Sequence, residues 1–249
     1  MATTQTKISF AVDRKEVVLV KPFKPTPSEV LSCSTIDNDP NLELICHSVF
    51  VYQANGDHSP DKDPACIIEE ALSKALVYYY PLAGKLKRQS DGRLKITCNN
   101  NADDADGVPF LVATAHCQLS SLNYLDGIDV ETAKQFAFDF VDSESNDDLG
   151  YHPLVLQVTK FSCGGFTIAM SLSHSICDGF GASQFFRALV EIASGKSEPS
   201  VKPVWKRELL VAKPVDEIPP FFVDMNSAAI AKFKEEMDAL KHSDECAGA

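Results

Sequence analysis

The sequence is poor in basic residues and has no long apolar run. Lys and Arg number 23 against 35 Asp and Glu, which gives a net charge of −12. This balance argues against nucleic acid as the main partner, because such binding needs clustered basic side chains. No stretch approaches the roughly 18 consecutive apolar residues of a membrane-spanning helix, and residues 1–18 contain no signal-peptide core. We therefore expect a cytoplasmic protein without a membrane segment.

Paired cysteines are also missing. The chain has eight cysteines but no Cys-x-x-Cys pair. In a chain without a secretion signal, scattered thiols are typically reduced and mostly buried. His174 and Cys177 could be two metal ligands, but no further paired Cys or His lies near them in the sequence. We expect no metal site and interpret Cys177 as a small buried apolar residue.

Motifs of three common enzyme classes are absent or incomplete. The chain has no GxSxG, which argues against a serine hydrolase of the α/β type. Residues 195–197 read GKS, but the glycine that a P-loop needs five residues earlier is Val190. Residues 179–181 read GFG, and the third glycine of a dinucleotide fingerprint is replaced by Gln184.

Apolar residues make up 45% of the chain, enough to form a sizeable core. Their helical spacing predicts helices over 64–80 and 178–195, with Gly195 as a C-terminal cap. Residues 118–150 are weakly patterned. Runs rich in β-branched and other apolar residues predict strands at 16–20, 44–52, two places within 82–97, 109–117, 153–161 and 166–174.

The composition changes after residue 195. Residues 196–220 contain five prolines, which is typical of a linker or crossover, and a new amphipathic helix is expected at 227–241. We therefore expect one domain over 1–195, a proline-rich crossover over 196–220, and the first helix of a second domain within 221–249.

His174 and Asp178 are the candidate site residues, and each has two interpretations. His174 ends an expected apolar strand, so it could be a core histidine that is hydrogen-bonded to a carbonyl. It could instead be reactive, because a strand that leads into a helix through a glycine-containing turn often presents functional side chains. Asp178 precedes the helix and could simply be its N-cap. The spacing alone leaves these alternatives open.

Five blocks of the sequence carry a more specific signal. HSICDG at 174–179 resembles the HxxxDG motif of the plant BAHD acyl-CoA-dependent acyltransferases, which are relatives of chloramphenicol acetyltransferase. The other blocks that resemble this family are 20–37, 71–86, 152–195 and 203–209. The resemblance implies a chloramphenicol acetyltransferase-like fold of the α+β or mixed α/β class, with a mixed sheet flanked by helices.

The resemblance also implies roles. His174 would be the general base, Asp178 would be structural, and Gly179 would let backbone or substrate approach closely. The co-substrate would be acyl-CoA, with no bound cofactor, and the acceptor a small-molecule alcohol. An amine acceptor, an inactive half-domain that acts as a binding module, and a hydrolase that uses water are the alternatives.

One family motif is missing. DFGWG, which the family carries in its later half, does not occur in this chain. The resemblance therefore implies that the chain corresponds to the amino-terminal half. The carboxy-terminal half carrying DFGWG would be a separate partner chain, or it would be missing because this chain is a fragment. Much of the CoA-binding surface would belong to that half, so residues that bind the CoA phosphates cannot be assigned from this sequence.

Overall fold

The computed structural model describes residues 10–54, 63–99, 106–138, 140 and 150–212. The helix expected at 227–241 lies outside these residues. Contacts divide the chain into one unit over Met1–Val211 and another over Ala212–Ala249. The described part of the expected crossover, through Val211, thus belongs to the same unit as the preceding domain.

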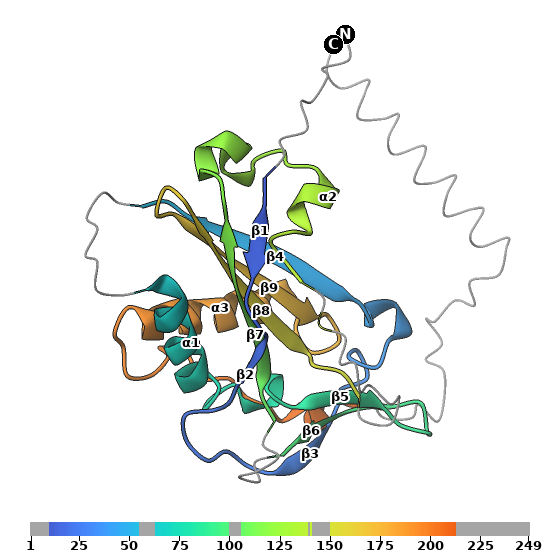
Figure 1. Cartoon of the computed structure of the whole chain (residues 1–249). Helices are drawn as coiled ribbons and strands as arrows, with labels where there is room; N and C mark the ends of the chain where they lie inside the picture. The colour runs from blue at the N-terminus through green and yellow to red at the C-terminus, as the bar shows by residue number, and fades with distance from the viewer. Residues whose placement is uncertain (1–9, 55–62, 100–105, 139, 141–149, 213–249) are drawn as a thin grey trace, which may run out of the picture. The chain divides into compact units, whose positions relative to one another are not determined.

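A mixed sheet forms the centre of the first unit (Figure 1). The strand order is β1-β7-β8-β9-β4. Both β1 and β2 pair with β7, β1 with residues 113–115 and β2 with residues 108–110. Among the described strands of this sheet, β7 and β8 run parallel and every other pair is antiparallel. Its strands are β1 (Val12–Arg14), β2 (Val18–Val20), β4 (Ile45–Tyr52), β7 (Val108–Ala115), β8 (Leu154–Phe161) and β9 (Phe166–Ser173).

A smaller antiparallel sheet has the order β3-β6-β5. Its strands are β3 (Glu29–Ser32), β5 (Lys85–Arg88) and β6 (Leu94–Cys98). The turn at 89–93 between β5 and β6 uses Gly92 in the left-handed region, with φ +78°. The two strands that the sequence predicts around this turn are thus confirmed.

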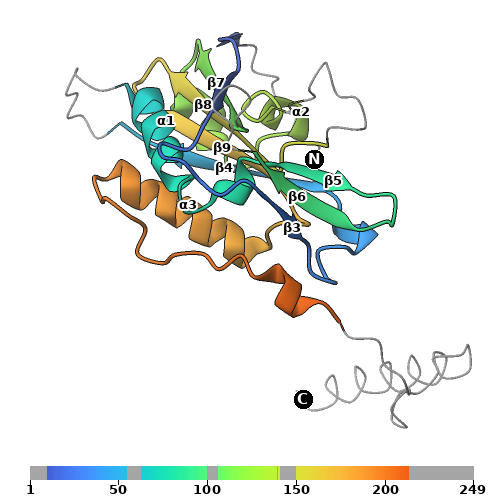
Figure 2. The same ribbon diagram turned by 90° about the horizontal axis from the view of Figure 1, so that it is seen from below.

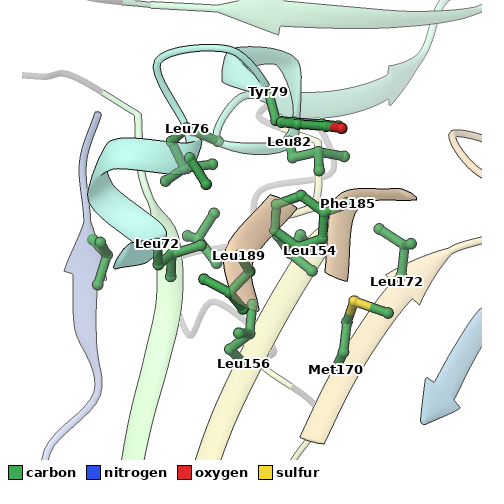
Figure 3. Packing of buried hydrophobic residues seen from close by; sticks show 14 of the residues in the cluster. Leu72, Leu76, Tyr79, Leu82, Leu154, Leu156, Met170, Leu172, Phe185 and Leu189 are labelled. Atoms are coloured by element: carbon green, nitrogen blue, oxygen red, sulfur yellow. The ribbon is translucent and has the colours of Figure 1, made fainter. Parts of the chain in front are cut away.

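Two helices, α1 (Pro64–Ala75) and α3 (Gly179–Ala193), contact each other and cover one face of the main sheet (Figure 2). Their apolar sides pack on the alternate residues of β8 and β9 that point toward them (Figure 3). Fully buried members of this core include Leu72, Leu76, Leu154, Leu156, Phe185 and Leu189. The mixed sheet with flanking helices confirms the predicted fold class.

The helix predicted over 64–80 is shorter than expected. It ends at Ala75, and Tyr80–Leu82 form a 3₁₀ turn, η2. The bonding changes before Pro81 is reached, because the Val77 and Tyr78 N–H groups donate to carbonyls three residues earlier, the pattern of a 3₁₀ turn. The weakly patterned segment contains η3 (Leu119–Leu125) and the one-turn helix α2 (Val130–Ala133). The remaining 3₁₀ turns are η1 (Pro40–Leu42) and η4 (Arg207–Leu210).

Candidate active site

His174 lies directly after β9, in the turn that leads into α3. The strand ends at Ser173, one residue earlier than the sequence predicts, and the His174 backbone N–H donates to the Leu44 carbonyl at 2.9 Å. The side chain is half-buried. Its Nδ1 is buried and has no hydrogen-bond partner among the described residues. The interpretation as a core histidine held by a carbonyl therefore finds no support at Nδ1.

Asp178 ends the same turn and caps α3. Its Oδ1 accepts a hydrogen bond of 2.8 Å from the Gly181 backbone N–H, and its backbone is extended, as an N-cap requires. The N-cap interpretation is confirmed. Within the described residues no hydrogen bond joins Asp178 to His174, so the two side chains do not form a dyad in this structure.

Gly179 and Gly181 differ in the space around them. A Cβ at Gly179 would meet no described atom within 4 Å, so nothing in the described residues requires glycine there. A Cβ at Gly181 would lie 2.6 Å from the Cys177 sulfur, well inside contact distance. Gly181 thus has a close side-chain neighbour within the protein, and the role expected for Gly179 toward backbone or substrate stays a prediction.

A cavity of about 590 Å³ opens beside His174. Segments 34–42, 79–82, 174–184 and 202–210 contribute to its walls, so it brings together parts of the chain that are far apart in sequence. A second cavity of about 490 Å³ is lined by segment 43–45, Phe138, Phe140, and residues at and beside β8 and β9. It includes Leu44, whose carbonyl accepts the hydrogen bond from the His174 backbone N–H.

Cys177 lies in the wall of the first cavity. Burial is the largest cause that raises the pKa of its thiol to about 11, so the neutral thiol dominates at neutral pH. A thiol in this state is a poor nucleophile. The protonated thiol is consistent with the interpretation of Cys177 as a small apolar residue.

Several cavity residues were given no chemical role in the sequence analysis. Asp37, Trp205 and Arg207 all line the cavity. Asp37 and Arg207 form an ion pair of 2.8 Å, although 170 positions separate them. Both lie inside blocks that resemble the acyltransferase family, 20–37 and 203–209, which is the signal that could have drawn attention to them.

Other expected features can be compared with the described part of the chain. There, no cluster of three metal-ligating side chains occurs, and the seven described cysteines are free. None of the described helices combines the length and apolar character needed to cross a bilayer.

Comparison with known proteins places the chain in a family. The Transferase family model matches residues 10–243. The chain belongs to this family. A spermidine sinapoyl-CoA acyltransferase of Arabidopsis thaliana is 45% identical over 89% of the chain, and a spermidine coumaroyl-CoA acyltransferase of the same plant is 49% identical over 81%. The resemblance to BAHD acyltransferases is thus confirmed.

This Transferase family chain spans 48% and 42% of the lengths of those two relatives. Among solved structures, vinorine synthase superposes with a TM-score of 0.61 at 27% identity, covering 79% of this chain and 46% of that one. A TRI101 structure from F. sporotrichioides, complexed with coenzyme A and T-2, has a TM-score of 0.53 at 18% identity. It covers 68% of this chain and 40% of that one, and at this identity it supports the fold alone.

Proposed function

We propose that this chain carries the general base of an acyl-CoA-dependent acyltransferase. The observation that carries the proposal is the placement of His174. It lies on the wall of the cavity, while the neighbouring carboxylate of Asp178 is used to cap α3. Imidazole can accept and release a proton near neutral pH, as a general base must.

The reaction would proceed by direct attack. His174 takes a proton from the acceptor nucleophile as that atom forms a bond to the thioester carbonyl carbon. The tetrahedral oxyanion then collapses, the carbon–sulfur bond breaks, and the imidazolium returns the proton to the CoA sulfur. No covalent acyl-enzyme is needed, which agrees with the raised pKa of Cys177.

The larger cavity is the proposed place of the reaction. It is lined by His174, whereas the second cavity is not and includes Leu44, whose carbonyl accepts a hydrogen bond from the His174 backbone N–H. A donor and an acceptor must both reach the imidazole, so we expect the reacting groups of both to lie in the larger cavity. Proximity and orientation of bound reactants can account for a large part of an enzymatic rate enhancement.

The sequence resemblance predicts an alcohol acceptor, with an amine as the alternative. The relatives at 45% and 49% identity have spermidine in their names, whereas a (Z)-3-hexen-1-ol acetyltransferase of Arabidopsis thaliana is 39% identical. This difference favours an amine acceptor as the second candidate. An aliphatic amine has a pKa near ~10 and attacks only when neutral. Its acylation should therefore keep accelerating above pH 8, whereas alcohol acylation should reach a plateau.

We further propose that a carboxy-terminal half carrying DFGWG completes the enzyme. The support is the coverage of 48% and 42% of the two spermidine acyltransferases. Native mass spectrometry of the purified protein tests this directly. A second polypeptide of similar size bound to the chain supports the proposal, and a chain that acylates its acceptor alone contradicts it.

His174→Ala tests the assignment of the base. Product and free CoA are measured by mass spectrometry with a panel of acyl-CoA donors and with spermidine or primary alcohols. We expect a fall in kcat of about 10²–10⁴-fold, the usual contribution of a general base. His116→Ala is the matched control, because His116 is exposed, pairs with Asp13 at 2.6 Å and is not part of the cavity wall. Equal activity of the two variants, each measured with the carboxy-terminal half present, would refute the assignment of His174 as the base, and a wild type without activity under these conditions would favour a binding module.

A further inference from the structure

Arg207 contacts the turn that carries His174 although it comes from a distant segment. Its Nη2 donates a hydrogen bond to the carbonyl oxygen of Ile176, which lies midway between His174 and Asp178. Its Nη1 pairs with the Asp37 carboxylate at 2.8 Å. One planar guanidinium thus joins two acceptors from different parts of the chain, a geometry that its fork of donors suits.

This ion pair is largely removed from water. The exposed fraction is 17% for the Arg207 side chain and 15% for that of Asp37, so the pair is screened less than a surface pair. Asp37 is itself held in place. Its carboxylate accepts a bond of 2.7 Å from the Ser34 backbone N–H, and the Ser34 hydroxyl accepts one of 3.1 Å from the Asp37 N–H. Arg207 is therefore bonded to an acceptor with a fixed position.

Trp205 fixes the other side of Arg207. Its indole N–H donates to the Tyr78 carbonyl at 3.1 Å, and its ring lies edge-on to Tyr79. The Arg207 guanidinium carbon is 5.5 Å from the centre of the indole ring, within the range of a cation–π contact. The guanidinium is thus confined between Trp205, Asp37 and the carbonyl of Ile176.

The other bonds of the turn lead to a different place. The His174 N–H donates to the Leu44 carbonyl at 2.9 Å, and the Ser175 hydroxyl donates to the Leu42 carbonyl at 3.1 Å. Both fasten the beginning of the turn to segment 42–44. The bond from Arg207 instead holds the middle of the turn, at the Ile176 carbonyl, and the same guanidinium pairs with Asp37 in segment 34–37. Loss of this bond would leave the Ile176 carbonyl without its donor and allow the turn to pivot about its first two residues.

We propose that Arg207 is a positioning residue for His174, which fixes the imidazole by holding the Ile176 carbonyl against the Asp37 carboxylate. Its consequence for rate rests on the proposed function, whereas its effect on the turn does not. A misplacement of about 1 Å in a catalytic group can reduce a rate about 100-fold. If loss of Arg207 displaces the imidazole by a similar distance, we expect a measurable fall in the rate of acyl transfer.

The test compares Arg207→Gln and Arg207→Lys with Arg88→Gln. Arg88 is a close chemical match, because it pairs with the Glu43 carboxylate at 2.6 Å and donates to the Gly92 carbonyl. Its side chain is 31% exposed, and neither of its partners belongs to the turn. A lysine at position 207 would keep the charge but could not span both acceptors, so its effects should be intermediate.

Amide hydrogen exchange provides the first readout and requires no activity. We expect exchange in peptides covering 173–181 and 33–38 to be about 10-fold faster in Arg207→Gln, because the turn opens locally. Arg88→Gln should leave these peptides unchanged. Equal protection of the turn in wild type and Arg207→Gln would overturn the proposal. If Arg207→Gln does not fold, Arg207→Lys and Asp37→Asn give the same comparison.

Steady-state kinetics provides the second readout, at a temperature well below the melting midpoint of every variant. We expect kcat to fall about 10- to 100-fold in Arg207→Gln, with KM for acyl-CoA changed less than about 2-fold. A lowered melting midpoint with unchanged kcat would show a purely structural residue and overturn the proposal. A complex of the wild-type chain with its carboxy-terminal half that forms no product would instead refute the proposed function, and hydrogen exchange would still decide the role of Arg207.

Discussion

Substitution of Asp178 separates helix capping from chemistry in the HxxxD motif. The structure uses Oδ1 of Asp178 to accept from the Gly181 N–H at the start of α3. Asparagine offers the same carbonyl geometry without charge, whereas alanine offers no acceptor. Asp178→Asn should therefore retain the cap, and Asp178→Ala should lose it. The pair of variants isolates the hydrogen bond from the charge.

The magnitudes follow from the exposed position of Asp178. Loss of an N-cap costs about 1 kcal/mol, within a range of about 0.5–2. A carboxylate at a helix N-terminus adds only about 0.3–0.5 kcal/mol when it is exposed and screened. Asp178→Ala loses both contributions, so with about 2–4 °C per kcal/mol for a chain of this size it should lower the melting midpoint by about 2–10 °C. Asp178→Asn should lower it by at most about 2 °C.

Differential scanning calorimetry and product formation are measured on the same preparations. Asp126→Ala is the control, because Asp126 is exposed and its side chain caps no described α-helix. If the melting midpoint of Asp178→Ala equals that of wild type, the cap contributes nothing to stability and the reasoning fails. If Asp178→Asn loses activity while its melting midpoint is unchanged, the carboxylate acts on the reaction and its role is more than capping.

Two further predictions concern the same turn. Gly181→Ala should lose much of the roughly 1 kcal/mol that alanine gains over glycine in a helix, because its Cβ would lie 2.6 Å from the Cys177 sulfur, which has to move. The double variant with Cys177→Ala should recover much of this loss in urea unfolding, and additive effects would refute the steric explanation. Burial raises the pKa values of Cys33 and Cys177 to about 11 from 9.0. Iodoacetamide at pH 8 should therefore label exposed Cys46 well before either of them, as peptide mass spectrometry would show. Because these two thiols stay protonated in the folded state, their contribution to stability should be lost as the pH rises above about 9.

Local patterns predicted most of the elements. The two strands predicted at 153–161 and 166–174, joined by a glycine-containing loop, are confirmed as the hairpin β8–β9. The helix predicted between Asp178 and Gly195 is confirmed as α3, because caps and turns are determined by neighbouring residues. The end of the first helix was missed. Pro81 predicts an end at residue 80 and Tyr78–Tyr80 continue the apolar character, but the chain turns to i→i−3 bonding after Ala75, which no local sequence signal marks.

Long-range relations could not be obtained in this way. Nothing in the local sequence indicates that β7 pairs parallel with β8, or that Asp37 meets Arg207 across 170 positions. Such contacts depend on how the whole sheet orders its strands. The functional assignment of His174 likewise came from resemblance, since a single histidine at a strand end is equally compatible with a core role. The structure adds the cavity and the unpartnered Nδ1.

The edge position of β4 has a consequence for synthesis of the protein. Among the described strands β4 pairs only with β9, and Ile45 lies opposite Ser173. The backbone hydrogen bonds of β4 therefore cannot all form until Ser173 has been synthesised. About 120 residues lie between the two strands, and at 5–20 residues per second the ribosome needs about 6–24 s to make them. During that interval a nascent chain carries an early strand with unsatisfied amides. A chaperone that binds extended apolar segments would bind the nascent chain there, and the turn that carries His174 would form only after β9 has paired with β4.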